Sequence, residues 1–146
     1  MPKLVLFAAC ERVLIDQQNM LSLVGVIQEL KVQVPESGQV PSATSSAPIK
    51  WDVITQWAKL PDDTGKNFEQ RIAMFNPAGQ ATAVSAVAAL DLSGTYNRTI
   101  ATVLGFPIGT PGRHTIKLWL SENGKETEHP LAEYWIDIVF DVLRKQ

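Results

Sequence analysis

The sequence predicts an all-β protein, a two-sheet antiparallel β-sandwich of eight or nine strands. In most windows apolar and polar residues alternate with a period of two, and β-branched residues are enriched there. The nine prolines and nine glycines fall between these windows, so that turn signals recur about every 8–12 residues, as is typical of a sandwich. A closed barrel remains an alternative, because one closed sheet and two packed sheets give the same alternation.

The length and composition predict a single domain over residues 1–146. Hydrophobic residues make up 45% of the chain and charged residues 19%, which is enough apolar material for one buried core. Residues 35–48 stand apart, because they contain three prolines among small polar residues. We expect this segment to be a flexible loop, since proline cannot donate to a strand ladder.

Charge and cysteine content exclude several classes of function. Thirteen Lys and Arg against fifteen Asp and Glu give a net charge of −2 and a pI near 5.6. Such a balance provides no basic stripe for nucleic acid or for an anionic membrane, so neither is expected as a partner. The single Cys excludes an internal disulfide framework and a multi-cysteine metal centre. We expect no cofactor.

The N-terminal segment resembles a lipoprotein signal at Phe7-Ala8-Ala9-Cys10. The apolar run before it, residues 4–7, is shorter than the roughly 7–15 residues that a signal peptide needs. We therefore expect a buried strand here. No segment approaches about 18 consecutive apolar residues, and we expect a cytoplasmic protein.

Strands are predicted in order along the chain. Residues 4–15 and 20–27 form an antiparallel hairpin around a polar turn, and residues 30–34 extend the second strand past a bulge. Residues 49–57 form a half-buried strand with Trp51 and Trp57 on its core face. The next three strands, separated by Pro, Gly, Asn and Asp turns, cover residues 68–75, 82–90 and 98–106.

The last third of the sequence gives the clearest pattern. Asn123-Gly124 supplies the two positive-φ positions of a type I′ hairpin turn after the strand at residues 113–120. A long strand follows at residues 132–142. The expected core faces of these two strands are His114, Ile116, Leu118 and Leu120 on the first, and Ala132, Tyr134, Ile136, Ile138, Phe140 and Val142 on the second.

The order of several segments resembles a known family. They are the stretch from Phe7 to Val13, the stretch from Leu21 to Ile27, the proline-rich loop, and the stretch from Pro111 to Leu120 before the Asn-Gly turn. Together they resemble a family of small uncharacterised bacterial and phage proteins with an immunoglobulin-like or C2-like β-sandwich. The resemblance implies that fold. The family has no assigned activity and no catalytic residues to transfer.

Several strands are apolar on both faces, although a lone sandwich hides only one face of each sheet. Opposite the core faces of the last two long strands lie Trp119, Trp135, Val139 and Leu143. These four side chains represent about 500 Å² of apolar surface, whose burial at ~25 cal/mol per Å² would contribute about 12 kcal/mol before association entropy is subtracted. The leading hypothesis is therefore a non-enzymatic protein–protein interaction or assembly module that self-associates through these residues.

Two alternatives remain open. The first is a small-ligand or calcium-binding sandwich, with Asp62 and Asp63 in a turn as metal ligands or a cleft near His114 as the site; calcium would need further oxygen ligands. The second is a hydrolase with Cys10 as nucleophile and His114 as base, which requires the two side chains within hydrogen-bond reach. The glycines at 105, 109 and 112 precede a strand instead of a helix, so no phosphate loop is expected.

Overall fold

The computed structural model describes residues 1–143 and is all-β, as the alternation predicts. Ten strands and one short 3₁₀ turn occur in this part of the chain, against the eight or nine strands expected. Within these residues no helix is long and apolar enough to cross a membrane. The elements are β1 (Lys3–Ile15), β2 (Leu21–Val26), β3 (Glu29–Val34), β4 (Ser46–Ala58), η1 (Pro61–Asp63), β5 (Phe68–Phe75), β6 (Ala81–Ala89), β7 (Tyr96–Pro107), β8 (Gly112–Glu122), β9 (Lys125–Glu126) and β10 (Ala132–Val142).

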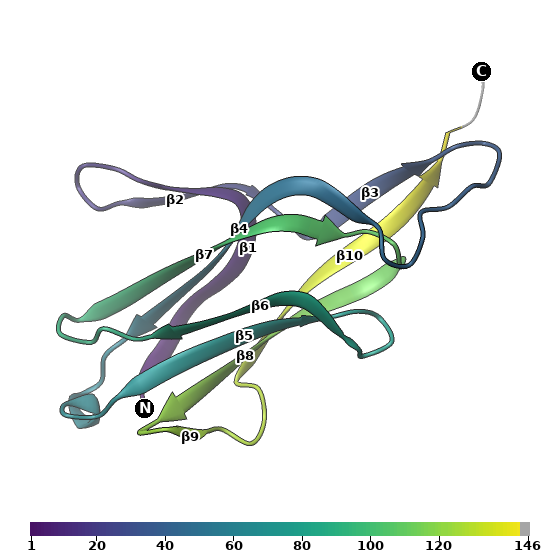
Figure 1. Ribbon diagram of the computed structural model, residues 1–146. Coiled ribbons are helices and arrows are strands. Elements are labelled where there is room, and N and C mark those ends of the chain that lie inside the picture. The colour runs from purple at the N-terminus through teal and green to yellow at the C-terminus, as the bar shows by residue number, and fades with distance from the viewer. Residues whose placement is uncertain (144–146) are drawn as a thin grey trace.

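The strands form two sheets (Figure 1). The first, sheet A, has the order β2-β1-β4-β7. The second, sheet B, has the order β3-β10-β8-β5-β6, with β9 paired to β8. All neighbouring strands are antiparallel except β3 and β10, which are parallel.

The chain crosses from one sheet to the other between β2 and β3. The prediction that residues 30–34 extend the second strand is therefore wrong, because β3 pairs with β10 in sheet B. The crossing is fixed by backbone hydrogen bonds: Ile27 N–H donates to Ala9 O at 2.9 Å, and Asp137 N–H donates to Gln28 O at 2.9 Å. Gly25 permits the bend, since its φ is 65° and a Cβ there would lie 2.7 Å from the Glu11 side chain.

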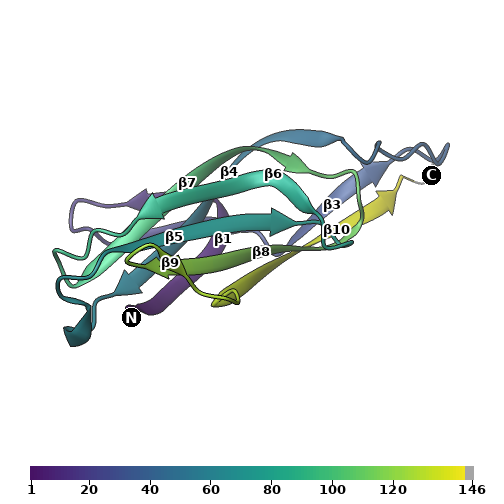
Figure 2. The ribbon, with the colours of Figure 1, turned by 60° about the horizontal axis from the view of Figure 1, so that its bottom comes forward.

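On the opposite side the two sheets remain separate. The edge strand of sheet A is β7 and that of sheet B is β6, and no strand ladder joins them. Figures 1 and 2 show these two strands running alongside each other. We call the space between them the seam. Each of its edges carries backbone N–H and C=O groups that no ladder uses.

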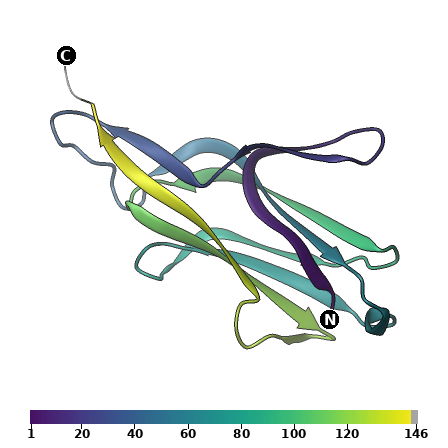
Figure 3. The same cartoon turned by 180° about the vertical axis from the view of Figure 1, so that it is seen from behind.

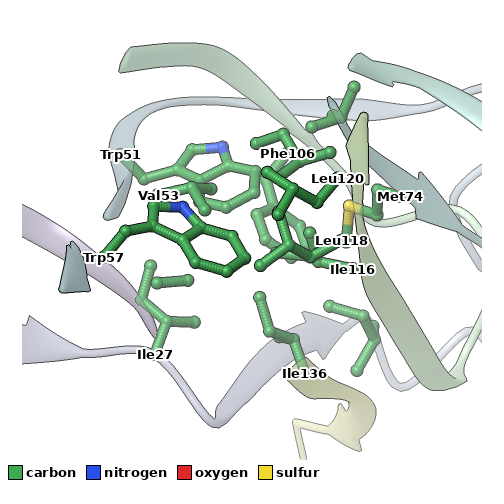
Figure 4. Packing of buried hydrophobic residues seen from close by; sticks show 14 of the residues in the cluster. Ile27, Trp51, Val53, Trp57, Met74, Phe106, Ile116, Leu118, Leu120 and Ile136 are labelled. Atoms are coloured by element: carbon green, nitrogen blue, oxygen red, sulfur yellow. The ribbon is translucent and has the colours of Figure 1, made fainter. Parts of the chain in front are cut away.

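Side chains from both sheets form one core (Figure 4). Trp51, Val53 and Trp57 of β4 face residues of β8 such as Ile116 and Leu118, and all five are buried. The predicted core faces of residues 49–57 and 113–120 are thus confirmed. Each large apolar side chain buried here contributes about 1.5–3 kcal/mol relative to its exposure in water.

A buried amide joins the two sheets inside this core. Gln70 of β5 accepts hydrogen bonds through Oε1 from the Thr55 hydroxyl at 2.7 Å and from the Trp57 indole N–H at 2.8 Å. Both donors are on β4, in the other sheet. Buried polar groups require such partners, so this bridge fixes how the sheets face each other.

The C-terminal strands follow the predicted hairpin geometry. Asn123 and Gly124 have φ of 50° and 84°, which confirms the tight turn between β8 and β9. On β10, Ile136 and Ile138 are buried as expected, whereas Val142 is 52% exposed. The reason is that β8 ends its pairing at Gly112 opposite Ile138, so that the last residues of β10 pair only with β3.

The proline-rich segment is shorter than predicted. Ser46–Pro48 belongs to β4, where Ser46 and Ala47 pair with Pro107 and Phe106. Pro48 is tolerated because the register shifts between Ala47 and Lys50, and a bulge does not need its missing N–H. Residues 35–45 connect β3 to β4.

Candidate functional site

The outer face of sheet B carries aromatic and basic side chains in alternation. These come from β5, β8 and β10, the three central strands of the sheet. We call this surface the aromatic face and define it by Arg71, Phe75, Arg113, Trp119 and Trp135. Strand register places Arg71 opposite Trp119, while Thr115 lies opposite both Phe75 and Trp135.

Trp135 is the most exposed aromatic residue of this face, at 53%. The Arg113 guanidinium lies 4.3 Å from its ring centroid, and Glu133 accepts a 3.3 Å hydrogen bond from the indole N–H. Asp137 fixes the guanidinium through two hydrogen bonds of 2.9 and 3.3 Å. Those bonds lower the pKa of the Asp137 carboxyl. The indole thus contacts a guanidinium and a carboxylate, while about half of the residue remains exposed.

Trp119 occupies an equivalent environment on β8, but it is half-buried. Arg71 lies 3.9 Å above its ring, and Phe75 packs against it edge-on with centroids 6.2 Å apart. Glu126 of β9 binds the guanidinium of Arg71 at 2.8 and 2.9 Å, which lowers the pKa of the Glu126 carboxyl. Glu126, on the short β9, thus adds a carboxylate to the aromatic face.

Val139 and Leu143 continue the apolar surface beyond β8. Val139 lies on the same side of β10 as Trp135 and is 39% exposed, while Leu143 is 50% exposed. In this region β10 pairs only with β3, and the pair projects from the body of the protein (Figures 1 and 3). The structure thus places Trp119, Trp135 and Val139 on one outer face, with Leu143 at its end.

The acidic turn does not assemble a calcium site. Asp63 is buried, and its carboxylate accepts the Leu60 N–H at 2.7 Å and pairs with the Met1 ammonium at 2.8 Å. Burial raises the pKa of Asp63, but these hydrogen bonds outweigh it and the pKa lies below its usual value. Asp62 is exposed. Within residues 1–143 no three His, Cys, Asp or Glu side chains come together as metal ligands.

Cys10 and His114 are not brought together. Cys10 is fully buried in β1 opposite Asp52, and burial, followed by the Asp52 charge, raises the pKa of its thiol. His114 is in β8 of the other sheet, where Nδ1 lies 3.4 Å from Gly112 O. No hydrogen bond joins the two side chains in the described part of the chain. The nucleophile and base that the hydrolase alternative needs are therefore not paired.

A cavity of about 450 Å³ opens in the seam, at the end where β7 turns toward β8. The small-ligand alternative placed a cleft near His114, and His114 lines this cavity, but the sequence did not identify its other walls. Its other walls come from residues 43–46, Asn76, residues 81–84, residues 103–105, Pro107, Gly109 and Thr110. For the other walls the sequence gives no signal, since most of these residues have small uncharged side chains.

Comparisons with known proteins give only distant likeness. No family model and no curated protein matches the chain. Among solved structures, a β-glucosidase from Listeria innocua in complex with isofagomine aligns with a TM-score of 0.39 and 11% identity over 97% of this chain. The DNA glycosylase AlkC from Pseudomonas fluorescens aligns with a TM-score of 0.35 and 12% identity over 77% of it. The chain spans 17% and 30% of those two proteins.

Proposed function

We propose that this protein is a non-enzymatic interaction module that associates with a second copy of itself through the aromatic face and the adjoining Val139 and Leu143. The observation that carries the proposal is the half-exposed Trp135, whose ring lies beside the Arg113 guanidinium that Asp137 binds. Tryptophan and arginine are the residues most enriched among interface anchors. A side chain whose neighbours already restrict it loses less conformational entropy on association.

The charges around the aromatic face favour a second copy as the partner. Arg113 and Lys117 lie beside Glu133 and Asp137 in the ladder between β8 and β10. A surface that carries both signs in one small area can oppose itself in a two-fold contact without a net repulsion. A strongly charged partner would find no complementary field here.

We further propose an immunoglobulin-like or C2-like β-sandwich and membership of the small bacterial and phage family that the sequence resembles. Support comes from the core, to which both sheets contribute, and from the predominantly antiparallel pairing. We also propose a cytoplasmic assembly component, with which a single buried Cys that forms no disulfide is compatible.

The test is the mass of the protein in solution by light scattering, with Trp135→Glu as the variant. We expect the wild type to associate at high micromolar concentration and the variant to be a folded monomer, because burying the new carboxylate would oppose association. The control is Val26→Glu on β2, where the replaced side chain is 48% exposed on the other sheet. It should associate as the wild type does. A monomeric wild type, or equal dissociation of both variants, would overturn the proposal.

A further inference from the structure

We infer that the seam cavity is a binding site for a small uncharged ligand with an aliphatic body and a hydroxyl or amide hydrogen-bond donor. This inference stands apart from the proposed self-association, because the cavity lies between β6 and β7 and the aromatic face lies on β5, β8 and β10. The volume of about 450 Å³ is in the range of small-molecule sites, about 300–1,000 Å³.

The end of the cavity is closed by tight backbone packing. A Cβ at Gly109 would lie 2.1 Å from Ser42 O, and one at Gly105 would lie 2.8 Å from the Ser46 hydroxyl. Ile108 N–H also donates to Ser45 O at 3.1 Å. The two glycines thus let the segment before β4 seat closely against β7. Residues 43–46 therefore form a wall of the cavity that is held in place by these contacts.

The lining determines which charge a ligand can carry. None of the sixteen lining residues has a carboxylate, ammonium or guanidinium group. His114 is buried, and burial lowers the pKa of its imidazole, so the ring is neutral at physiological pH. A charged ligand would lose its hydration without meeting an opposite charge. The cavity therefore selects against ions.

His114 determines whether a ligand must donate or accept the hydrogen bond at this point of the cavity. Its Nδ1 faces the Gly112 carbonyl oxygen, which can only accept, so the N–H belongs to Nδ1 and Nε2 carries a lone pair. Among residues 1–143 no hydrogen bond to Nε2 is found, and Nε2 is not among the fully buried polar atoms that lack a partner, so it can accept a hydrogen bond from water or from a ligand. A ligand O–H or N–H would donate to Nε2 in place of water. The hydroxyls of Thr44, Ser46 and Thr110 in the lining can serve further polar groups.

The apolar part of the lining determines the body of the ligand. Val84 and Val103 lie on the facing edge strands, Leu104 is 82% exposed and lies at the rim, and the imidazole is the only aromatic ring among the lining residues. Flat aromatic ligands therefore find no stacking surface other than the imidazole, whereas an aliphatic chain or ring can pack against the branched side chains. Backbone groups of the unpaired edges add donors and acceptors along the seam.

The test uses four probes with one ring and different polar groups: cyclohexanol, cyclohexanone, cyclohexylammonium and cyclohexanecarboxylate. Binding is followed by chemical-shift changes of ¹⁵N-labelled protein. We expect cyclohexanol to saturate at roughly millimolar Kd, as its few heavy atoms allow. The shifts should centre on the amides of residues 81–84 and 103–105 and on His114 Nε2. The acceptor-only ketone and the two ions should bind at least about tenfold more weakly, because each lacks the neutral donor.

Variants separate this site from unspecific binding. His114→Phe keeps a ring but removes the acceptor, and Ala81→Leu fills the cavity from an exposed position; each should weaken cyclohexanol about tenfold or more. The matched control, Ala89→Leu at the far end of β6, should bind as the wild type does. Equal binding of all four probes, shifts that do not saturate or lie elsewhere, or no effect of Ala81→Leu in a folded variant would overturn the inference.

Discussion

The Arg113 guanidinium lies 4.3 Å from the centroid of the Trp135 ring, on a strand that pairs with the strand of Trp135. Asp137 holds it there through two hydrogen bonds, and Glu126 holds Arg71 over Trp119 in the same way. The aromatic face therefore consists of two separate units, each made of an indole, an arginine and a carboxylate. This arrangement allows the two units to be perturbed one at a time.

The first prediction concerns the independence of these units. Asp137→Asn should move the indole N–H resonance of Trp135 and leave that of Trp119 in place, since only Arg113 loses its charged partner. Glu126→Gln should do the reverse. The measurement is a ¹H–¹⁵N spectrum with the four indole signals assigned by Trp→Phe variants. If either variant moved both signals equally, the two stacks would be coupled and the assignment of separate units would fail.

A second prediction concerns the amide bridge between the sheets. Gln70→Leu removes the acceptor of two buried donors, Thr55 and Trp57. Because each of the two buried donors left without a partner costs about 1–3 kcal/mol, the free energy of unfolding should fall by about 2–6 kcal/mol. Urea unfolding measures it. The control is Gln17→Leu at an exposed turn position, which should change stability by less than about 0.5 kcal/mol. A Gln70→Leu loss no larger than the control's would mean that the bridge contributes nothing.

The third prediction concerns the Cys10 thiol. It is fully buried and its pKa is raised, first by burial and then by the charge of Asp52. Only the thiolate attacks a disulfide reagent, so native protein should react with DTNB far more slowly than protein unfolded in urea. An exposed thiol introduced by Ser37→Cys in a Cys10→Ala background provides the comparison rate. Equal rates for the two native thiols would contradict the burial of Cys10 and revive its candidacy as a nucleophile.

Most of the secondary structure could be predicted because alternation reports directly on a strand. The faces of β8 and β10 and the turn at Asn123-Gly124 follow from residue order alone. The partner of β3 could not be predicted, because a period of two shows that a segment is a strand but does not identify its neighbour. β3 pairs with a strand that lies about a hundred residues further along the chain.

In the candidate sites, too, local residue order predicts some features, whereas others depend on which strands pair. The outward position of Trp119 and Trp135 follows from their parity within their strands. The arginine above Trp119 comes from another strand, so finding it requires the register between β5 and β8. A cleft near His114 was proposed from the sequence, but its other walls could not be predicted, because they combine short segments from separate regions of the chain, most of them with small uncharged side chains. No local pattern marks such residues.

The last prediction is a pH dependence of stability that comes from His114. Burial lowers the pKa of this imidazole in the folded state, whereas in the unfolded chain it titrates near its ordinary value of 6.5. Between the two pKa values the unfolded state binds more protons, so acid favours unfolding there. The free energy of unfolding should therefore fall as the pH decreases below about 6.5, and this contribution should level off below the folded pKa. Above pH 6.5 His114 contributes no slope.

Urea unfolding at pH 7.5 and pH 5.5 measures this effect. The wild type and His129→Gln, which alters an exposed histidine, should lose more stability between the two pH values than His114→Gln does, since glutamine does not titrate. The carboxylates also titrate in acid, but they contribute equally to all three proteins. The difference between the His114→Gln and His129→Gln slopes therefore isolates the buried imidazole. Identical slopes would show that the ring is protonated without cost and would contradict a neutral His114 at the base of the cavity.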